Sequence, residues 1–177
     1  MRDIPFVDQC GFIEYPKFID IVSILVGKLR DIVDTELDEK ENRFKRGDKS
    51  DSVNPLGVRG ELIFQHYLWT LNVPHESAPL LSNRPISSCD IKVGEFALDV
   101  KTVRSDAPDL LVNEEAHLKA KGITHYVFIQ IQRPGQARYW IYARHDVSKW
   151  QVKNVGYSNA YYLEIEKINK RQMEVAV

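Results

Sequence analysis

The sequence predicts an α/β protein with a mixed β-sheet flanked by helices, and three observations support this. Apolar residues recur at three- and four-residue steps over residues 16–44, which is the period of an amphipathic helix. From residue 86 onward, short apolar or alternating segments are separated by turn residues, which is typical of strands. Helical patterns interrupt these strands, and such an order favours helices packed against one sheet.

The first part of the chain is expected to be mostly helical. Residues 1–15 show no regular pattern, and a helix is expected over 16–44 because Pro16 suits a helix start. Glycine, serine, asparagine and proline make residues 46–57 a connector, and a second helix is expected over 58–71. The first helix carries an apolar stripe that is expected to pack on the core or on a second copy of the chain: Phe18, Val22, Leu25, Leu29, Ile32, Val33 and Leu37.

The sheet is expected in the second half of the chain. Prolines make residues 72–85 a loop or a short edge segment. After it, the pattern predicts strands over 86–93 and 96–103, joined by a turn at Gly94-Glu95. A helix capped by Asn113 is expected over 113–121. Strands are expected over 125–132 and 137–143, followed by a helical turn within 145–150 and a last strand within 161–168.

Composition places the chain among ordinary globular proteins. Its 177 residues suit one domain, which we divide into an N-terminal helical extension (1–50) and a core (51–177). No apolar stretch has the length of a membrane span, no signal peptide is visible and only two cysteines are present, so a cytoplasmic protein with reduced thiols is expected. The net charge of −1 argues against binding DNA mainly through a basic surface, but metal-binding carboxylates in a nuclease would also lower the total.

The segment 86–103, ISSCDIKVGEFALDVKTV, contains the residues that best indicate chemistry. Side chains alternate along a strand, so Asp99 and Lys101 project from one face while the apolar residues between them face a helix. Pairing across the turn places Asp90 roughly opposite Asp99. Two carboxylates that face each other across a ladder repel, and a bound cation removes that cost.

Mg²⁺, with Mn²⁺ as a substitute, is the expected cation, because Mg²⁺ prefers carboxylates, waters and phosphate oxygens as ligands. Asp90 and Asp99 would supply the carboxylates, and Val100 would add its backbone carbonyl. Such a metal lowers the pKa of a bound water and stabilises charge on a phosphate. Lys101 would orient or deprotonate that water, or neutralise developing charge, and the sequence leaves these roles open.

Glu61 is the third candidate carboxylate. It heads an apolar stripe on the second helix that continues through Phe64, Leu68 and Leu71. Because a buried charge needs a partner, we expect a helix packed on the sheet to deliver Glu61 to the metal. The alternative is structural, since a carboxylate near the start of a helix stabilises the helix dipole.

This set of residues resembles the PD-(D/E)xK nuclease superfamily, the restriction-endonuclease-like fold. The residues that carry the resemblance are Glu61 on a helix, then Asp90, then Asp99-x-Lys101 after a hairpin, and it covers roughly residues 56–145. Cys89 stands where the motif has proline, and one early core strand would have to come from residues 73–81. The resemblance implies a core in the order α-β-β-β-α-β, a Mg²⁺-dependent endonuclease that hydrolyses phosphodiester bonds in DNA, and a homodimer for cleavage of two strands. It also implies that Asp90, Asp99 and Glu61 serve the metal and that Lys101 is the catalytic lysine.

Two other functions stay open. One is a catalytically degenerate nuclease-fold protein that acts as a nucleic-acid-binding or assembly subunit. The other is an unrelated metal-dependent phosphohydrolase for small molecules, which the lack of a glycine-rich phosphate loop disfavours. Polar or aromatic residues on later strands would contact water, substrate or bases in one interpretation and would serve packing in another: Gln130, Gln132, Tyr139, Trp140 and Tyr142.

Overall fold

The computed structural model describes residues 10–41, 53–79, 89–156 and 158–169, and within them the chain is a mixed α/β protein. Its main sheet has the strand order β1-β7-β6-β4-β3-β2, in which β4 and β6 are parallel and every other pair is antiparallel. The six strands are β1 (Cys10–Glu14), β2 (Glu76–Ser77), β3 (Ile91–Val93), β4 (Phe96–Val103), β6 (His125–Arg133) and β7 (Gln136–Ala143).

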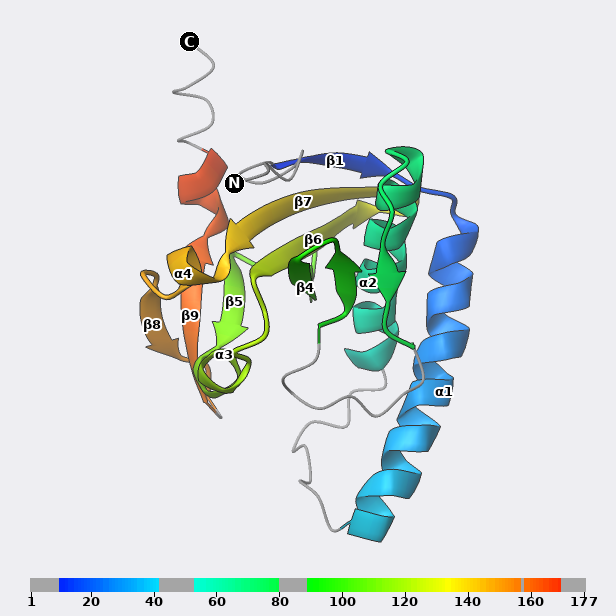
Figure 1. The fold of residues 1–177 in the computed structure, drawn as a ribbon, viewed down its shortest axis with the longest axis horizontal. Coiled ribbons are helices and arrows are strands. Elements are labelled where there is room, and N and C mark those ends of the chain that lie inside the picture. The colour runs from blue at the N-terminus through cyan, green and yellow to red at the C-terminus, as the bar shows by residue number, and fades with distance from the viewer. Residues whose placement is uncertain (1–9, 42–52, 80–88, 157, 170–177) are drawn as a thin grey trace.

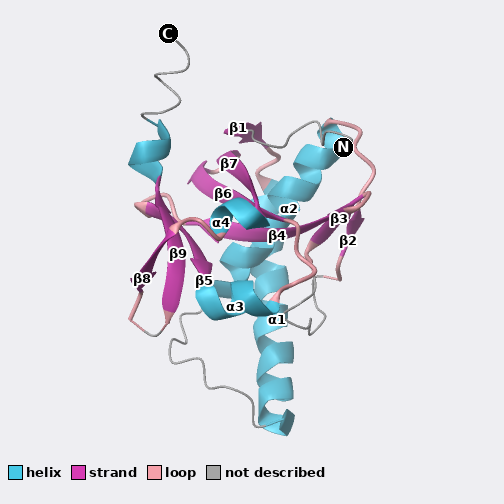
Figure 2. Ribbon diagram, turned by 60° about the vertical axis from the view of Figure 1, so that its left-hand side comes forward, coloured by secondary structure: helices cyan, strands magenta, loops and turns pink. Residues whose placement is uncertain are grey.

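A second sheet and the helices complete the fold (Figures 1 and 2). The smaller sheet has the antiparallel order β5-β9-β8, with β5 (Asp109–Asn113), β8 (Gln151–Asn154) and β9 (Asn159–Glu164). The helices are α1 (Phe18–Glu41), α2 (Val53–Thr70), α3 (Glu114–Lys119) and α4 (Arg144–Val147), and residues 165–169 are also helical. None of the described helices is both long and apolar enough to span a membrane.

Two hydrophobic clusters lie on opposite faces of the six-stranded sheet. On one face, Leu98 and Val100 of β4 pack with Ile63, Phe64 and Leu68 of α2. On the other face, Tyr126 and Phe128 of β6 pack against the smaller sheet and the last helical segment. The sheet is therefore a central layer, with α2 on one side and the β5-β9-β8 sheet on the other. The helix α1 packs on α2 and forms an outer layer.

The alternation predicted for the β3–β4 hairpin is confirmed. Val93 pairs with Phe96 and Ile91 with Leu98, so the turn lies at Gly94-Glu95. Leu98 and Val100 belong to the α2-side core, whereas Asp99 pairs in register with Tyr126, which belongs to the opposite cluster. Asp99 therefore projects away from α2, as the strand period requires.

Most expected elements are present, with several differences. Residues 10–14 are not irregular but form β1, an edge strand paired with β7. The strands β5 and β8 were not expected. The short β2 lies where the missing early strand was sought. Of the connector predicted for 46–57, residues 46–52 lie outside the described residues, and residues 53–57 are not a connector but the start of α2. Residues 86–88 of the expected strand also lie outside the described residues, and within 89–93 only 91–93 are strand.

Of the two roles expected for the apolar stripe of α1, packing on the core is wrong for most of its described residues, and packing on a second copy stays a prediction. Phe18, Leu25 and Ile32 of that stripe are more than half exposed, and the buried side of the helix carries Ile19 and Ser23 instead. The reason is steric. A Cβ added at Gly27 would lie 2.4 Å from backbone atoms of Pro55, so α1 meets α2 through its glycine-bearing side at a distance that large side chains would prevent.

Candidate functional site

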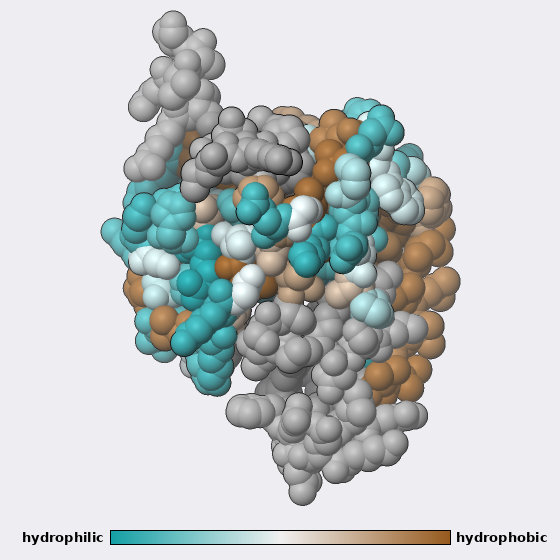
Figure 3. All heavy atoms as spheres, in the orientation of Figure 1, coloured by the Kyte–Doolittle hydropathy of each residue, from teal (hydrophilic) through white to brown (hydrophobic). Residues whose placement is uncertain are grey.

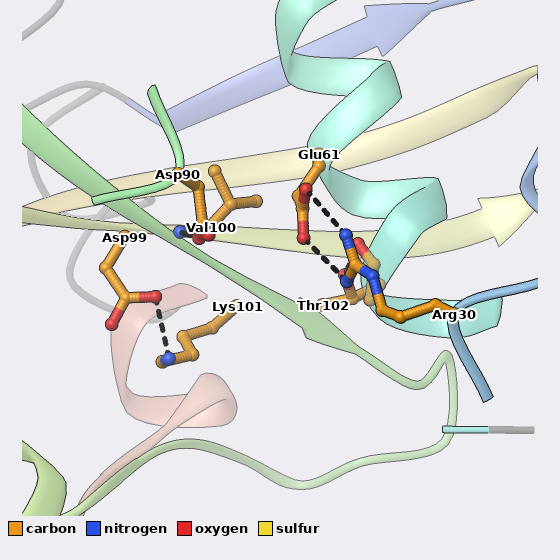
Figure 4. A network of polar contacts seen from close by, with 8 residues as sticks. Arg30, Glu61, Asp90, Asp99, Val100, Lys101 and Thr102 are labelled. Carbon is orange, nitrogen blue, oxygen red and sulfur yellow. Dashed lines mark hydrogen bonds and ion pairs between the residues drawn. The ribbon is translucent and has the colours of Figure 1, made fainter. Parts of the chain in front are cut away.

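The candidate site lies at the edge of β4, where β3 ends. The ladder between these strands stops at Ile91 and Leu98, and the Asp90 amide makes one more hydrogen bond, 2.9 Å to the Leu98 carbonyl. Beyond that point the hydrogen-bond partner of β4 is the Asp90 side chain and no longer the backbone of β3. Its Oδ2 accepts a 2.7 Å hydrogen bond from the Val100 amide (Figure 4). Asp90 and Asp99 are therefore near each other, as the sequence predicted, but Asp90 is fixed by backbone rather than by a paired strand.

The Val100 carbonyl is directed toward the same edge. In a strand, the N–H and C=O of one residue point to the same side, and the Val100 N–H points at Asp90. Within the described residues, β3 does not continue alongside Val100, so no strand pairs with this edge there. A carboxylate oxygen of Asp90 and the Val100 carbonyl thus both lie at this edge of β4.

Asp99 and Lys101 form an ion pair on the face of β4 turned away from α2. The Lys101 Nζ lies 2.7 Å from Asp99 Oδ1. The lysine side chain is 40% exposed and the aspartate 18%, so the ammonium reaches solvent while the carboxylate is partly enclosed. Asp99 pairs in register with Tyr126, so it faces this side of the sheet; burial and, secondly, the Asp99 charge raise the pKa of Tyr126 to about 12.

Glu61 reaches the site because α2 lies unusually close to β4. A Cβ added at Gly60 would lie 2.1 Å from Thr102 Oγ1, a distance that real side chains do not occupy. The absence of a side chain at Gly60 therefore lets the helix backbone approach the strand. Glu61 is only 5% exposed and lies on the α2 side of β4, near Asp90 and opposite to Asp99 (Figure 4).

Arg30 of α1 is a residue of this site that sequence reasoning missed. Its two terminal nitrogens lie 3.2 and 3.4 Å from Oε1 and Oε2 of Glu61, which is a two-pronged ion pair. Both side chains are mostly buried, at 16% and 7% exposure, so the pair is protected from solvent. The close approach of α1 to α2 at Gly27 places Arg30, one turn later, over Glu61. No local pattern signals this contact, because the partners are 31 residues apart.

The neighbouring charges of the site and its burial shift the pKa of Asp90 strongly. Its pKa is raised from 3.8 to about 7, first by burial and then by the charges of Glu61 and Asp99. The hydrogen bond from Val100 and the charge of Lys101 lower it, but they do not offset the first three causes. Asp90 thus stands between two other carboxylates in a region shielded from water, and a positive charge placed there would stabilise its ionised form.

The three carboxylates do not form one ligand cluster. Among the described residues, no group of three or more His, Cys, Asp or Glu side chains is arranged to hold a metal ion. The physical reason is that β4 separates Glu61 from Asp99, and each of these carboxylates has its own basic partner. At the strand edge Asp90 is bonded to the Val100 amide, and Asp99 lies near enough for its charge to raise the pKa of Asp90. Carboxylate and carbonyl oxygens are the kinds of ligand that Mg²⁺ takes, together with water and phosphate oxygens.

Three of the other polar and aromatic candidates are buried and serve packing: Gln130, Tyr139 and Trp140. Gln130 is buried and donates hydrogen bonds to the carbonyls of Arg104 and Ser105, which hold the loop after β4 against β6. Gln132 in turn donates to Gln130 Oε1 at 2.8 Å. Tyr139 and Trp140 are buried in opposite clusters, and the Tyr139 hydroxyl bonds to that of Tyr67 at 3.0 Å. These buried rings do not present faces to a nucleic acid.

Comparisons with protein-family models and with curated proteins gave no match to this chain, so its function is argued from its own residues.

Proposed function

We propose that this protein is a metal-dependent nuclease of the restriction-endonuclease-like fold that hydrolyses phosphodiester bonds, with DNA as the expected substrate. The observation that carries the proposal is the arrangement at the β4 edge. There Asp90 is held against the Val100 amide, and Asp99 and Lys101 project from the adjoining face. The element order α2, β2, β3, β4, α3, β6 also supports it, since it matches the α-β-β-β-α-β order expected for the fold, with β5 inserted before α3.

Each residue of the site has a separate proposed role. Asp90, Asp99 and the Val100 carbonyl would hold Mg²⁺, which when bound lowers the pKa of a water ligand and stabilises charge on the phosphate. Lys101, partly exposed and 2.7 Å from Asp99, is placed to donate to a phosphate oxygen or to orient the attacking water. Glu61 and Arg30 act from the α2 side. Glu61 adds negative charge that favours a cation beside Asp90, and Arg30 prevents that charge from standing alone in the core.

A second candidate is a non-catalytic subunit that binds nucleic acid or partners through the same fold. Two observations favour it. Both oxygens of Glu61 are engaged by Arg30, and the described residues hold no group of three His, Cys, Asp or Glu side chains that suits a metal. A degenerate site stabilised by internal ion pairs would have these properties. Cleavage and metal binding separate the two candidates.

The test is cleavage of supercoiled plasmid and single-stranded DNA by the purified full chain in Mg²⁺ or Mn²⁺. Lys101→Ala and Asp99→Asn should each reduce cleavage by about 100-fold or more, the usual contribution of a positioned acid–base group. Lys149→Ala is the matched control, because Lys149 also forms a 2.7 Å ion pair with an aspartate, Asp146, on an exposed turn. It should cut like the wild type.

A parallel thermal-shift titration with Mg²⁺ or Mn²⁺ should stabilise the wild type, and Asp90→Asn should remove most of that shift. Wild-type protein that neither cuts these substrates nor responds to either metal would contradict the nuclease and support the non-catalytic subunit. Equal activity in Lys101→Ala and wild type would show that any cleavage arises elsewhere.

A further inference from the structure

The outer face of α1 is strongly apolar and exposed. We define this outer face as seven large side chains on the side of the helix opposite to α2: Phe18, Ile21, Val22, Ile24, Leu25, Leu29 and Ile32. Their residues are between 37% and 64% exposed. Figure 3 shows the resulting brown surface along the edge of the molecule where α1 lies in Figure 1.

Among the described residues, α1 makes its contacts within the protomer through its other side. The side of α1 turned to α2 carries Ile19, Ser23, Gly27 and Arg30, which follow one another at helical spacing. Ile19 and Ser23 are buried, Gly27 makes the close approach to Pro55, and Arg30 binds Glu61. The contacts of α1 with the rest of the described chain are thus made by Ile19 together with small and polar residues. A helix that needed only these contacts would carry polar residues on its outer face.

The size of the outer face corresponds to a protein–protein interface. From their fractional exposures, the seven residues present roughly 700 Å² to solvent, whereas the largest apolar patch of a monomer is typically about 300–600 Å². A standard interface buries about 800 Å² per partner. Two such faces pressed together can therefore bury at most about 1,400 Å² in total, which lies within the range of about 1,200–2,000 Å² of specific interfaces.

We infer that the outer face of α1 binds the same face of a second copy of this chain in an antiparallel, two-fold arrangement with Leu25 near the axis. Charge decides the orientation. Residues 31–41 contain six acidic residues and one lysine, so a parallel pair would set two acidic segments side by side. In the antiparallel pair each acidic segment instead lies toward the partner's α1 N-terminus, where the helix dipole is positive and Lys17 is exposed. Asp31 also interacts within its own protomer, and the antiparallel pair does not depend on freeing it.

The first experiment is sedimentation velocity of the full chain at 5–100 µM in the absence of DNA, a range chosen to bracket about micromolar affinity. We expect a dimer for the wild type and a monomer for Leu25→Glu, with unchanged circular dichroism because Leu25 does not face the core. Leu118→Glu is the matched control, since Leu118 of α3 is 58% exposed and lies away from α1; it should remain dimeric. A monomeric wild type, or a Leu25→Glu protein that is still dimeric, would overturn the inference.

The second experiment tests orientation by disulfide cross-linking with an added oxidant, with Cys10 and Cys89 replaced by serine. In the antiparallel pair Phe18 of one copy faces Ile32 of the other. Phe18→Cys and Ile32→Cys should therefore cross-link when mixed and not when each is oxidised alone. Efficient cross-linking of Phe18→Cys with itself would indicate a parallel pair and reject the proposed geometry. Neither result depends on whether the protein cuts DNA.

Discussion

Replacing Asp90 by asparagine isolates the charge that the proposed metal would neutralise. The amide oxygen of asparagine can still accept the 2.7 Å hydrogen bond from Val100, so the backbone at the strand edge keeps its partner. Only the ability to ionise is lost. In the folded protein, burial and the neighbouring charges of Glu61 and Asp99 raise the pKa of Asp90 from 3.8 to about 7. The substitution therefore changes stability by an amount that depends on pH.

The direction and size follow from proton linkage. Between pH 3.8 and about 7 the folded state holds a proton on Asp90 that the unfolded chain has lost, so stability falls as the pH rises through this window. The stability that the protonated group contributes is complete below pH 3.8 and is lost once the pH passes about 7. Each pH unit corresponds to about 1.4 kcal/mol, so the ionised carboxylate costs up to about 4 kcal/mol, of which about 2–3 kcal/mol accumulates between pH 5 and 7.

The assay is urea unfolding of wild type and Asp90→Asn at pH 5 and pH 8 with divalent metals chelated. The stability advantage of Asp90→Asn should grow by about 2–3 kcal/mol from pH 5 to pH 8. Glu115→Gln is the control. The Glu115 pKa is lowered, chiefly by its hydrogen bond from Lys119, so this carboxylate is ionised throughout the range. Its effect should not vary between the two pH values.

A difference between wild type and Asp90→Asn that stays constant from pH 5 to pH 8 would refute the reasoning, because Asp90 would then ionise normally in the folded protein. Mg²⁺ at pH 8 provides a second readout. If a cation stabilises the ionised carboxylate, it should raise the stability of the wild type and narrow the gap to Asp90→Asn.

Two further predictions concern the packing that builds the site. Arg30→Met should cost about 3 kcal/mol in urea unfolding because it leaves Glu61 charged and buried, and adding Glu61→Gln should recover most of the loss; failure to recover would mean that the ion pair is not the cause. Gly60→Ala should lower stability by about 1–3 kcal/mol because its Cβ meets Thr102, and Thr102→Ala should relieve part of that cost. Gly57→Ala is its control, since a Cβ there meets nothing within 4 Å, and a thermal melt in which both alanine variants lose equal stability would contradict the steric explanation.

The elements that the sequence could predict are those whose pattern is local. The β3–β4 register follows from the turn residues and from alternation along β4, because a slip of one residue would turn every apolar side chain outward. The start of α3 follows from Asn113, whose Oδ1 accepts a 2.8 Å hydrogen bond from the Ala116 amide. The strands that were missed are short or lie at sheet edges. For example, β8 has a mostly exposed pattern with no apolar alternation to reveal it.

The apolar stripe of α1 also shows what a local pattern cannot predict. Periodicity identified an amphipathic helix, but it could not say that the side bearing Gly27 and Arg30, rather than the apolar stripe, meets α2. That choice depends on Gly27 and on the shape of the helix it meets at Pro55, which lies in another part of the chain.

For the site itself, the sequence alone determined that Asp99 and Lys101 share one face of a strand and that Asp90 lies beside them, because strand geometry has a fixed period of two. Only the tertiary structure decided that Glu61 and Asp99 lie on opposite sides of β4 and that Arg30 holds Glu61. The physical reason is that a buried charge takes its partner from whichever element packs against it. Here Gly27 lets α1 approach α2, and Gly60 lets α2 approach β4, so that Arg30 meets Glu61 beside the strand. Neither close approach leaves a periodic signal in the sequence.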